Sequence, residues 1–226
     1  MCCRPLVLSF LCFFYCYTIA TAQQNSIHNQ EVFNGREYLR YPYYFSKGTA
    51  YFQADSLATG TVLYDGVLCS GVPLLYDQLR DQLITADSSK QNLIRLVKEK
   101  VDRFSINQHQ FIHLKKQKGL SFIWPEEGYF EVIYNGQIKV LKKENKAIKQ
   151  SSSNNDLTKF IESGSAYYLL YGGKVTKIKN ERGLLTVFGD KKKEVRQFLK
   201  DNQLKFRKDT DNTIARTAAH VDSLIP

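Results

Sequence analysis

The chain of 226 residues has 43% hydrophobic and 24% charged positions, which is the composition of an ordinary globular protein. It is long enough to bury one good core, so we expect one main domain. Its 32 lysines and arginines exceed its 22 aspartates and glutamates, and the formal net charge is +10 at pH 7. This charge suits an anionic partner, although basicity also simply keeps a protein in solution.

The N-terminus has the pattern of a signal peptide. Arg4 precedes an apolar run at residues 6–17, and Ala20-Thr21-Ala22 fits the small-x-small pattern of a cleavage site. The run is too short to cross a hydrocarbon layer of about 30 Å comfortably. We therefore expect residues 1–22 to be cleaved, Gln23 to begin the mature chain, and that chain to have no transmembrane segment.

Export would limit which disulfides and which partners the mature chain can have. Of five cysteines only Cys69 remains, so an internal disulfide is excluded and we expect Cys69 to be a small buried hydrophobe. Loss of Arg4 lowers the charge from +10 to +9. Outside the cytoplasm a nucleic acid is not an expected partner. The expected partner is an anionic envelope component or another envelope protein. We expect the protein to be periplasmic, associated with the outer membrane or secreted.

The first mature residues are predicted to be an extended lead-in, residues 23–47. They contain the densest aromatic cluster of the chain, including Tyr41, Tyr43 and Tyr44. These rings could stack on sugar rings or lie along the sheet as packing. Pro42 removes a ladder donor and argues against a central strand here. Residues 48–55 then alternate in the manner of a strand.

Three two-residue hairpins form the predicted skeleton. Their turns are Asp65-Gly66, Asn135-Gly136 and Gly172-Gly173, which tolerate the positive φ angles of a type I′ turn. Each turn follows a tyrosine. Two-residue turns would pair aliphatic residues across the strands, and the predicted pairs are Leu63 with Leu68, Ile133 with Ile138, and Leu170 with Val175.

Other segments complete a predicted antiparallel sheet. Residues 101–106 and 110–114 could pair about Asn107-Gln108, and residues 82–86 and 160–171 are also expected strands. Residues 92–97 are expected to be a strand, although the spacing of Leu93, Val97 and Val101 also fits a helix. Residues 151–155 are expected to be an exposed loop, and residues 182–188 a final strand.

The last part of the chain changes to a helical period. Apolar residues indicate helices at about 190–201 and 210–225, and either Asp209 or Thr210 can cap the second. The predicted fold class is therefore α+β: a mainly antiparallel sheet of several hairpins, which could curve into a half-barrel, with two C-terminal helices. Residues 48–226 are expected to be a single β-rich domain.

Catalytic and cofactor motifs are missing from the sequence. Gly172-Gly173-Lys174 lacks the first glycine and the hydroxyl residue of a phosphate loop, and there is no Gly-x-Ser-x-Gly elbow. His109 and His113 share a strand face and could begin a metal site, but no third ligand is evident nearby. We expect no catalytic residues, no metal and no cofactor.

Two concentrations of basic residues are candidates for binding an anion or a partner. One follows the central hairpin, and the other opens the first C-terminal helix, where cations oppose the helix dipole. Either could instead be a solvated face. The candidate residues are Lys142, Lys143, Lys191, Lys192, Lys193 and Arg196.

Four phrases of the chain resemble a family of uncharacterised secreted or envelope proteins, rich in β-structure, from Gram-negative bacteria. They lie at residues 60–66, 72–77, 128–136 and 192–199. The resemblance covers most of the mature chain, implies an envelope or secreted location, and carries no activity that could be transferred.

The leading hypothesis for function is an exported, non-enzymatic module that binds a partner or has a structural role in the cell envelope. One alternative is a carrier that holds an apolar ligand in a curved sheet. Another is a hydrolase whose site residues are dispersed in the sequence, with Asp65, Asp77 or His109 as candidates.

Overall fold

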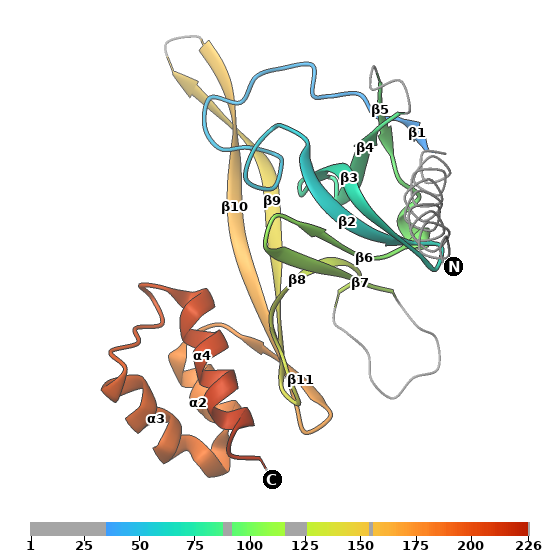
Figure 1. Ribbon diagram of the computed structural model, residues 1–226. Helices are drawn as coiled ribbons and strands as arrows, with labels where there is room; N and C mark the ends of the chain where they lie inside the picture. The colour runs from blue at the N-terminus through green and yellow to red at the C-terminus, as the bar shows by residue number, and fades with distance from the viewer. Residues whose placement is uncertain (1–34, 88–91, 116–125, 154–155, 226) are drawn as a thin grey trace, which may run out of the picture.

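The computed structural model describes residues 35–87, 92–115, 126–153 and 156–225. The predicted signal peptide, and the first part of the predicted lead-in, lie outside these residues. The described residues form one antiparallel sheet followed by three helices (Figure 1). The sheet is open, because β1 and β11 stand at opposite ends of the order β1-β5-β4-β3-β2-β6-β7-β8-β9-β10-β11. The predicted class, α+β and mainly β, is confirmed.

The two longest strands, β9 and β10, are neighbours in the sheet. They are β1 (Arg36–Glu37), β2 (Ala58–Tyr64), β3 (Val67–Asp77), β4 (Gln82–Ala86), β5 (Leu93–Arg95), β6 (Val101–Ile106), β7 (His109–Leu114), β8 (Gly128–Asn135), β9 (Lys139–Ser153), β10 (Asp156–Tyr171) and β11 (Lys174–Ile178). The helices are α2 (Glu181–Val187), α3 (Lys192–Asp201) and α4 (Thr210–Asp222), with short 3₁₀ turns at Lys98–Lys100 and Gly189–Lys191.

Two of the three predicted two-residue hairpins are confirmed. Leu63 pairs with Leu68 between β2 and β3, and Leu170 pairs with Val175 between β10 and β11. Both turns have the predicted positive φ angles, at Asp65-Gly66 and at Gly172-Gly173. Local turn chemistry is enough to set these two registers.

The central hairpin differs from its prediction. Asn135 pairs with Lys139, so three residues separate β8 from β9, and Ile133 does not pair with Ile138. The cause lies in α4. The Asp222 carboxylate accepts hydrogen bonds from the backbone N–H groups of Gln137 at 3.2 Å and Ile138 at 2.9 Å. The turn is therefore held open by a distant helix instead of closing on its own sequence.

The strands β9 and β10 form a long ribbon that runs the length of the molecule (Figure 1). Their register is continuous from Ser153 opposite Asp156 to Lys139 opposite Leu170. The expectation of an exposed loop at 151–155 is therefore wrong for residues 151–153, which belong to β9. Asn154 and Asn155 lie outside the described residues.

The segment 38–55, which we call the strap, is not a regular strand. Its one bridge to the sheet joins Tyr51 to Asp77, so the predicted strand at 48–55 is wrong. Alternation of side chains was a poor guide because the strap is held by scattered backbone hydrogen bonds and side-chain contacts and forms no continuous ladder. It leaves β1, crosses over to the ribbon and returns to β2 (Figure 1).

The segment predicted as a last strand, 182–188, is the helix α2. The Asn180 side chain accepts a hydrogen bond from the Gly183 N–H at 2.8 Å, which caps the helix. Leu184 and Leu185 are buried on one face and Phe188 follows them into the same core. There are thus three C-terminal helices, not two. The predicted helices at 190–201 and 210–225 correspond to α3 and α4, and Asp209 caps α4 at Asn212.

The strand predicted at 92–97 is confirmed in its middle as β5, and the helical alternative is wrong. The hairpin about Asn107-Gln108 is also confirmed, because Ile106 pairs with His109. Cys69 lies opposite Val62 as predicted and is 2% exposed, and burial raises the pKa of its thiol.

Two large hydrophobic cores lie at different parts of the sheet. In the first, the rings of Tyr76, Phe104, Phe111 and Tyr129 pack at centroid distances of 4.7–5.7 Å. In the second, the three helices cover apolar residues of β9, β10 and β11, including Val140, Leu169 and Ile178. Within the described part of the chain, no helix is both long enough and apolar enough to cross a bilayer.

Candidate functional site

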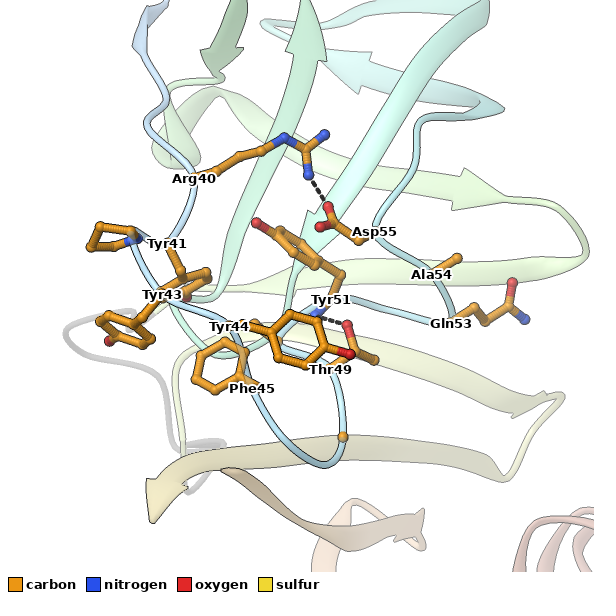
Figure 2. A pocket seen from close by; sticks show the side chains of 13 residues that line it. Arg40, Tyr41, Tyr43, Tyr44, Phe45, Thr49, Tyr51, Gln53, Ala54 and Asp55 are labelled. Carbon is orange, nitrogen blue, oxygen red and sulfur yellow. Dashed lines mark hydrogen bonds and ion pairs between the residues drawn. The ribbon is translucent and has the colours of Figure 1, made fainter. Parts of the chain in front are cut away.

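The strap encloses an open hollow lined mainly by aromatic side chains (Figure 2). Its volume is about 640 Å³, within the range of about 300–1,000 Å³ that is typical of small-molecule sites. Its lining residues come from the strap itself, and they are Arg40, Tyr41, Pro42, Tyr43, Tyr44, Phe45, Gly48, Thr49, Ala50, Tyr51, Gln53, Ala54 and Asp55.

A buried carboxylate anchors one end of the strap. Asp77 at the end of β3 is 0% exposed and accepts hydrogen bonds from the hydroxyls of Tyr38 at 2.7 Å and Tyr41 at 2.9 Å. The backbone N–H of Arg80 donates to it at 3.0 Å, and the Arg80 guanidinium lies 4.0 Å from the centroid of the Tyr41 ring. Burial, followed by hydrogen bonds with the Tyr51 hydroxyl and with Asp77, raises the pKa of Tyr38. The anchor holds its tyrosines as neutral donors.

The ribbon holds the other end. The Ser46 N–H donates to the Lys159 carbonyl at 2.8 Å, and the Ile161 N–H donates to the Lys47 carbonyl at 2.9 Å. The ammonium of Lys146 donates to the carbonyls of Thr49 at 2.9 Å and Tyr51 at 2.7 Å. Burial lowers the pKa of Lys146. The strap is thus fixed at two places that are far apart in sequence.

Between these two anchors, some of the side chains that line the hollow are exposed to solvent. Tyr44 is 90% exposed and lies in front of Phe45 and Thr49 in Figure 2. Arg40 and Asp55 form an ion pair, and their side chains are 44% and 55% exposed. An exposed ring and a charged pair therefore border the same hollow.

The three tyrosines predicted as aromatic contacts are brought together, but they have different roles. Tyr41 is a structural residue, because its hydroxyl binds Asp77 and its ring packs edge-on against Phe45 at 5.4 Å. Tyr43 is half-buried under the ammonium of Lys159, which lies 3.7 Å from its centroid. Tyr44 is the member of this trio whose ring is open to a ligand.

At the edge of the hollow, the Gln53 side chain is hydrogen-bonded to His109. Asn107 donates to the Gln53 side-chain oxygen at 2.9 Å, so the Gln53 amide nitrogen faces His109 Nε2 at 3.1 Å and donates to it. The other ring nitrogen, Nδ1, lies 2.5 Å from Glu131 and donates there. Both nitrogens of His109 are thereby engaged. The arrangement joins Gln53 of the strap to Glu131 of β8 through His109.

The other titratable candidates are also engaged in the structure. Asp65 forms an ion pair with Lys100 at 2.7 Å on the surface. His113 directs Nδ1 to the Val101 carbonyl at 3.0 Å, and burial lowers its pKa. Among the described residues, histidine, cysteine and acidic side chains do not gather in groups of three or more that could hold a metal ion.

Two of the predicted anion-binding lysines point into the protein. Lys143 is 8% exposed and binds Asp81 at 2.9 Å and the Tyr129 carbonyl at 3.1 Å. Lys142 is half-buried and pairs with Asp211 at 2.7 Å. A role for them as a free cationic surface does not fit this placement, because the two adjacent residues of β9 point to opposite faces of the sheet and each meets a carboxylate there.

The remaining basic candidates lie at the helical end. Lys192, Lys193 and Arg196 are exposed on α3, whereas Lys191 is half-buried and its ammonium lies 3.4 Å from the Leu224 carbonyl. They are far from the hollow, at the opposite end of the ribbon (Figure 1). The two groups of predicted contact residues therefore form separate surfaces.

Sequence reasoning missed Arg40, Asp55 and Lys146. The density of tyrosines indicated the strap, but nothing local showed that a lysine of β9 would bind its carbonyl groups. Comparisons with family models, curated proteins and solved structures gave no match to this chain. The resemblance to secreted envelope proteins stays a prediction.

Proposed function

We propose that this chain is an exported, non-enzymatic binding module of the cell envelope, and that the hollow binds a saccharide. The observation that carries the proposal is that the exposed ring of Tyr44 and the Arg40–Asp55 pair line the same hollow. The N-terminal sequence supports export. The expected location is periplasmic, associated with the outer membrane or extracellular.

The chemistry of this hollow suits a sugar ring. One face of a pyranose is made of C–H groups, which pack on an aromatic ring, and its hydroxyls both donate and accept hydrogen bonds. Tyr44 supplies an exposed ring face. Arg40 supplies several N–H donors and Asp55 supplies acceptors on the same rim. A purely apolar ligand would make no hydrogen bonds with this charged pair.

The anchoring of the strap supports binding by a preformed site. Asp77 fixes the strap at Tyr38 and Tyr41, and Lys146 fixes it at Thr49 and Tyr51. A rigid site loses less conformational entropy when a ligand binds. The rigid strap therefore supports a role for Tyr44 as a preformed contact for the ligand.

Two alternatives have less support. A hydrolase based on His109 would need a free ring nitrogen, and both nitrogens are engaged by Gln53 and Glu131. A carrier would need space within the curved sheet, but the rings of Tyr76 and Phe104 fill the first core. The hollow under the strap is open to solvent and its rim is charged, which favours a polar ligand with one apolar face.

The test is calorimetric titration with soluble glycans: an N-acetylglucosamine oligomer, a neutral glucan and an acidic polysaccharide. We expect one of these classes to bind, and Tyr44→Ala to weaken binding about tenfold. Covering one face of the ring contributes roughly half the value of full aromatic burial, or about 1–1.5 kcal/mol. Tyr44→Phe should retain most of the affinity.

The matched control is Leu39→Ala, which removes another exposed apolar side chain of the strap, 69% exposed, that does not line the hollow. It should leave the affinity unchanged. If none of the three glycan classes binds, the saccharide assignment is wrong. If a glycan binds but Tyr44→Ala and Leu39→Ala are equivalent, the hollow is not the site.

A further inference from the structure

The helix α3 has a row of cations along one flank. Lys192, Arg196 and Lys200 are each separated by four residues, so they lie one above another on the same side of the helix. Lys193 lies next to this row. The buried residues Val195 and Leu199 lie on another face, so the cations are not part of the core.

The acidic residues of α3 do not neutralise this flank. Glu194 and Asp201 are seven residues apart and share a different side of the helix. Asp201 accepts a hydrogen bond from Gln197 at 2.7 Å on that side. The helix surface is therefore divided into a basic flank and an acidic or polar flank.

The cations of α3 differ from the lysines of the sheet in their ion pairing. Seven lysines on or beside the strands take part in ion pairs: Lys98, Lys100, Lys115, Lys142, Lys143, Lys149 and Lys177. Within the part of the chain that the structure describes, Lys192, Lys193, Arg196 and Lys200 take part in no ion pair. Part of the positive charge of the protein is thus available on α3.

Helix stability does not explain Lys192 and Lys193, whereas Lys200 lies in the last turn, where a cation is favourable. The helix begins after Lys191 without a side-chain cap, and lysines in its first turn oppose the helix dipole. An exposed apolar side chain lies close to this end. The Lys191 ammonium contacts the Leu224 carbonyl at 3.4 Å, and Leu224 is 40% exposed.

We propose that the basic flank of α3 docks the protein on an anionic phospholipid bilayer. A straight row of cations matches a flat array of lipid phosphates, and lysine suits phosphate as a point charge. Leu224 supplies an apolar contact at the edge of the row. Nucleic acid is a poorer fit, because this flank of α3 carries no aromatic ring on which a base could stack, and Phe198, on the opposite side of the helix, is stacked on His220 at 4.1 Å.

This docking would separate the bilayer from the hollow. The strap contacts β10 at Lys159, and the helices pack on β10 at Leu169. Ten residues of strand span about 33 Å, so the hollow lies at the far end of the ribbon from α3. Docking through α3 would hold the saccharide site away from the lipid. The inference does not depend on the saccharide assignment.

The test uses the chain from Gln23, because the apolar run at 6–17 would itself bind lipid; all described elements lie after residue 34. Vesicle co-sedimentation is measured with phosphatidylcholine alone and with added phosphatidylglycerol. Binding should require phosphatidylglycerol and weaken with salt. The variant K192Q/R196Q should lower the partition coefficient about thirtyfold, since each cation near the surface contributes about fivefold.

The matched control is R36Q/K47Q, which removes one arginine and one lysine that are exposed at the other end of the protein. It should bind almost as tightly as the unmodified chain. Equal losses in the two variants would show attraction by net charge alone and would overturn the proposal. So would binding to both vesicle types alike, or displacement of the protein from vesicles by duplex DNA at an equal phosphate concentration.

Discussion

Asp222 in α4 sets the conformation of a turn that contains Ile138. Its Oδ1 accepts from the Ile138 N–H at 2.9 Å, and its Oδ2 accepts from the Tyr134 hydroxyl at 2.8 Å. One carboxylate near the end of the chain thereby joins the last helix to the hairpin between β8 and β9. This contact is the reason that the Asn135-Gly136 turn departs from the two-residue geometry that its sequence favours.

Replacement of Asp222 by alanine is expected to free this turn. The N–H groups of Gln137 and Ile138 lose their acceptor, so their amide hydrogens should exchange faster. The amides of the Leu63–Leu68 hairpin serve as an internal control and should be unaffected. Exchange measured by NMR tests this. Unchanged protection at Ile138 would mean that the turn holds itself.

Replacement of Asp77 by alanine is expected to destabilise the protein by about 3 kcal/mol. The change leaves two buried or half-buried tyrosine hydroxyls and the Arg80 N–H without their acceptor. For a chain of this size the melting temperature should fall by roughly 6–12 °C. Calorimetry measures the change. The control is Asp102→Asn, which breaks only an exposed ion pair with Lys115 and should shift stability by less than about 1 kcal/mol.

Asp81 is expected to make stability depend on pH in acid. Its burial acts to raise its pKa, but the charges of Lys143 and Lys98 and a hydrogen bond from Tyr76 outweigh this and lower it. The folded pKa is thus below the unfolded value of about 3.9, so the unfolded chain binds more protons. The stabilisation is present above the unfolded pKa and is lost as pH falls through the folded pKa.

Urea unfolding over a series of pH values measures this dependence. In Asp81→Asn the acid-induced loss of stability should be smaller than in the unmodified chain, although stability at neutral pH is lower. Asp102→Asn should keep the original profile. A profile for Asp81→Asn that is parallel to the original would show that other carboxylates cause the acid sensitivity.

Replacement of Leu184 by alanine tests the helix that sequence reasoning took for a strand. Leu184 is 0% exposed in the core formed with α3 and α4, so the loss should be about 3 kcal/mol. Thr186→Ala alters an exposed side chain of the same helix and should cost less than about 1 kcal/mol. Similar melting temperatures for the two variants would contradict the packing of α2.

Patterns read one segment at a time predicted much of the fold. The hairpins at Asp65-Gly66 and Gly172-Gly173 were predicted correctly because their turn residues and paired aliphatic side chains act locally. The helices α3 and α4 were predicted because their apolar period is regular. The segment of α2 was misassigned because it is short and apolar, and the Asn180 cap was not recognised.

The candidate site, like the fold, could be predicted from the sequence only in part. A cluster of tyrosines in residues 38–45 was evident from composition, and it does line the hollow. Which tyrosine is available was not evident, because that depends on Asp77 and Lys159, which are distant in the sequence. The buried state of Lys143 likewise depends on Asp81, 62 positions away along the chain.

The sequence by itself determined the elements whose stability comes from neighbouring residues: the tight turns, the amphipathic helices and the mainly antiparallel class. Only the tertiary structure decided which charges are neutralised and which remain exposed, because ion pairs join residues that no local pattern relates. Several lysines on or beside the strands meet carboxylates, such as Lys143 with Asp81, whereas the lysines of α3 face solvent. The long-range contacts of Asp77, Lys146 and Asp222 fix the strap and the central turn, and with them the surfaces at either end of the protein.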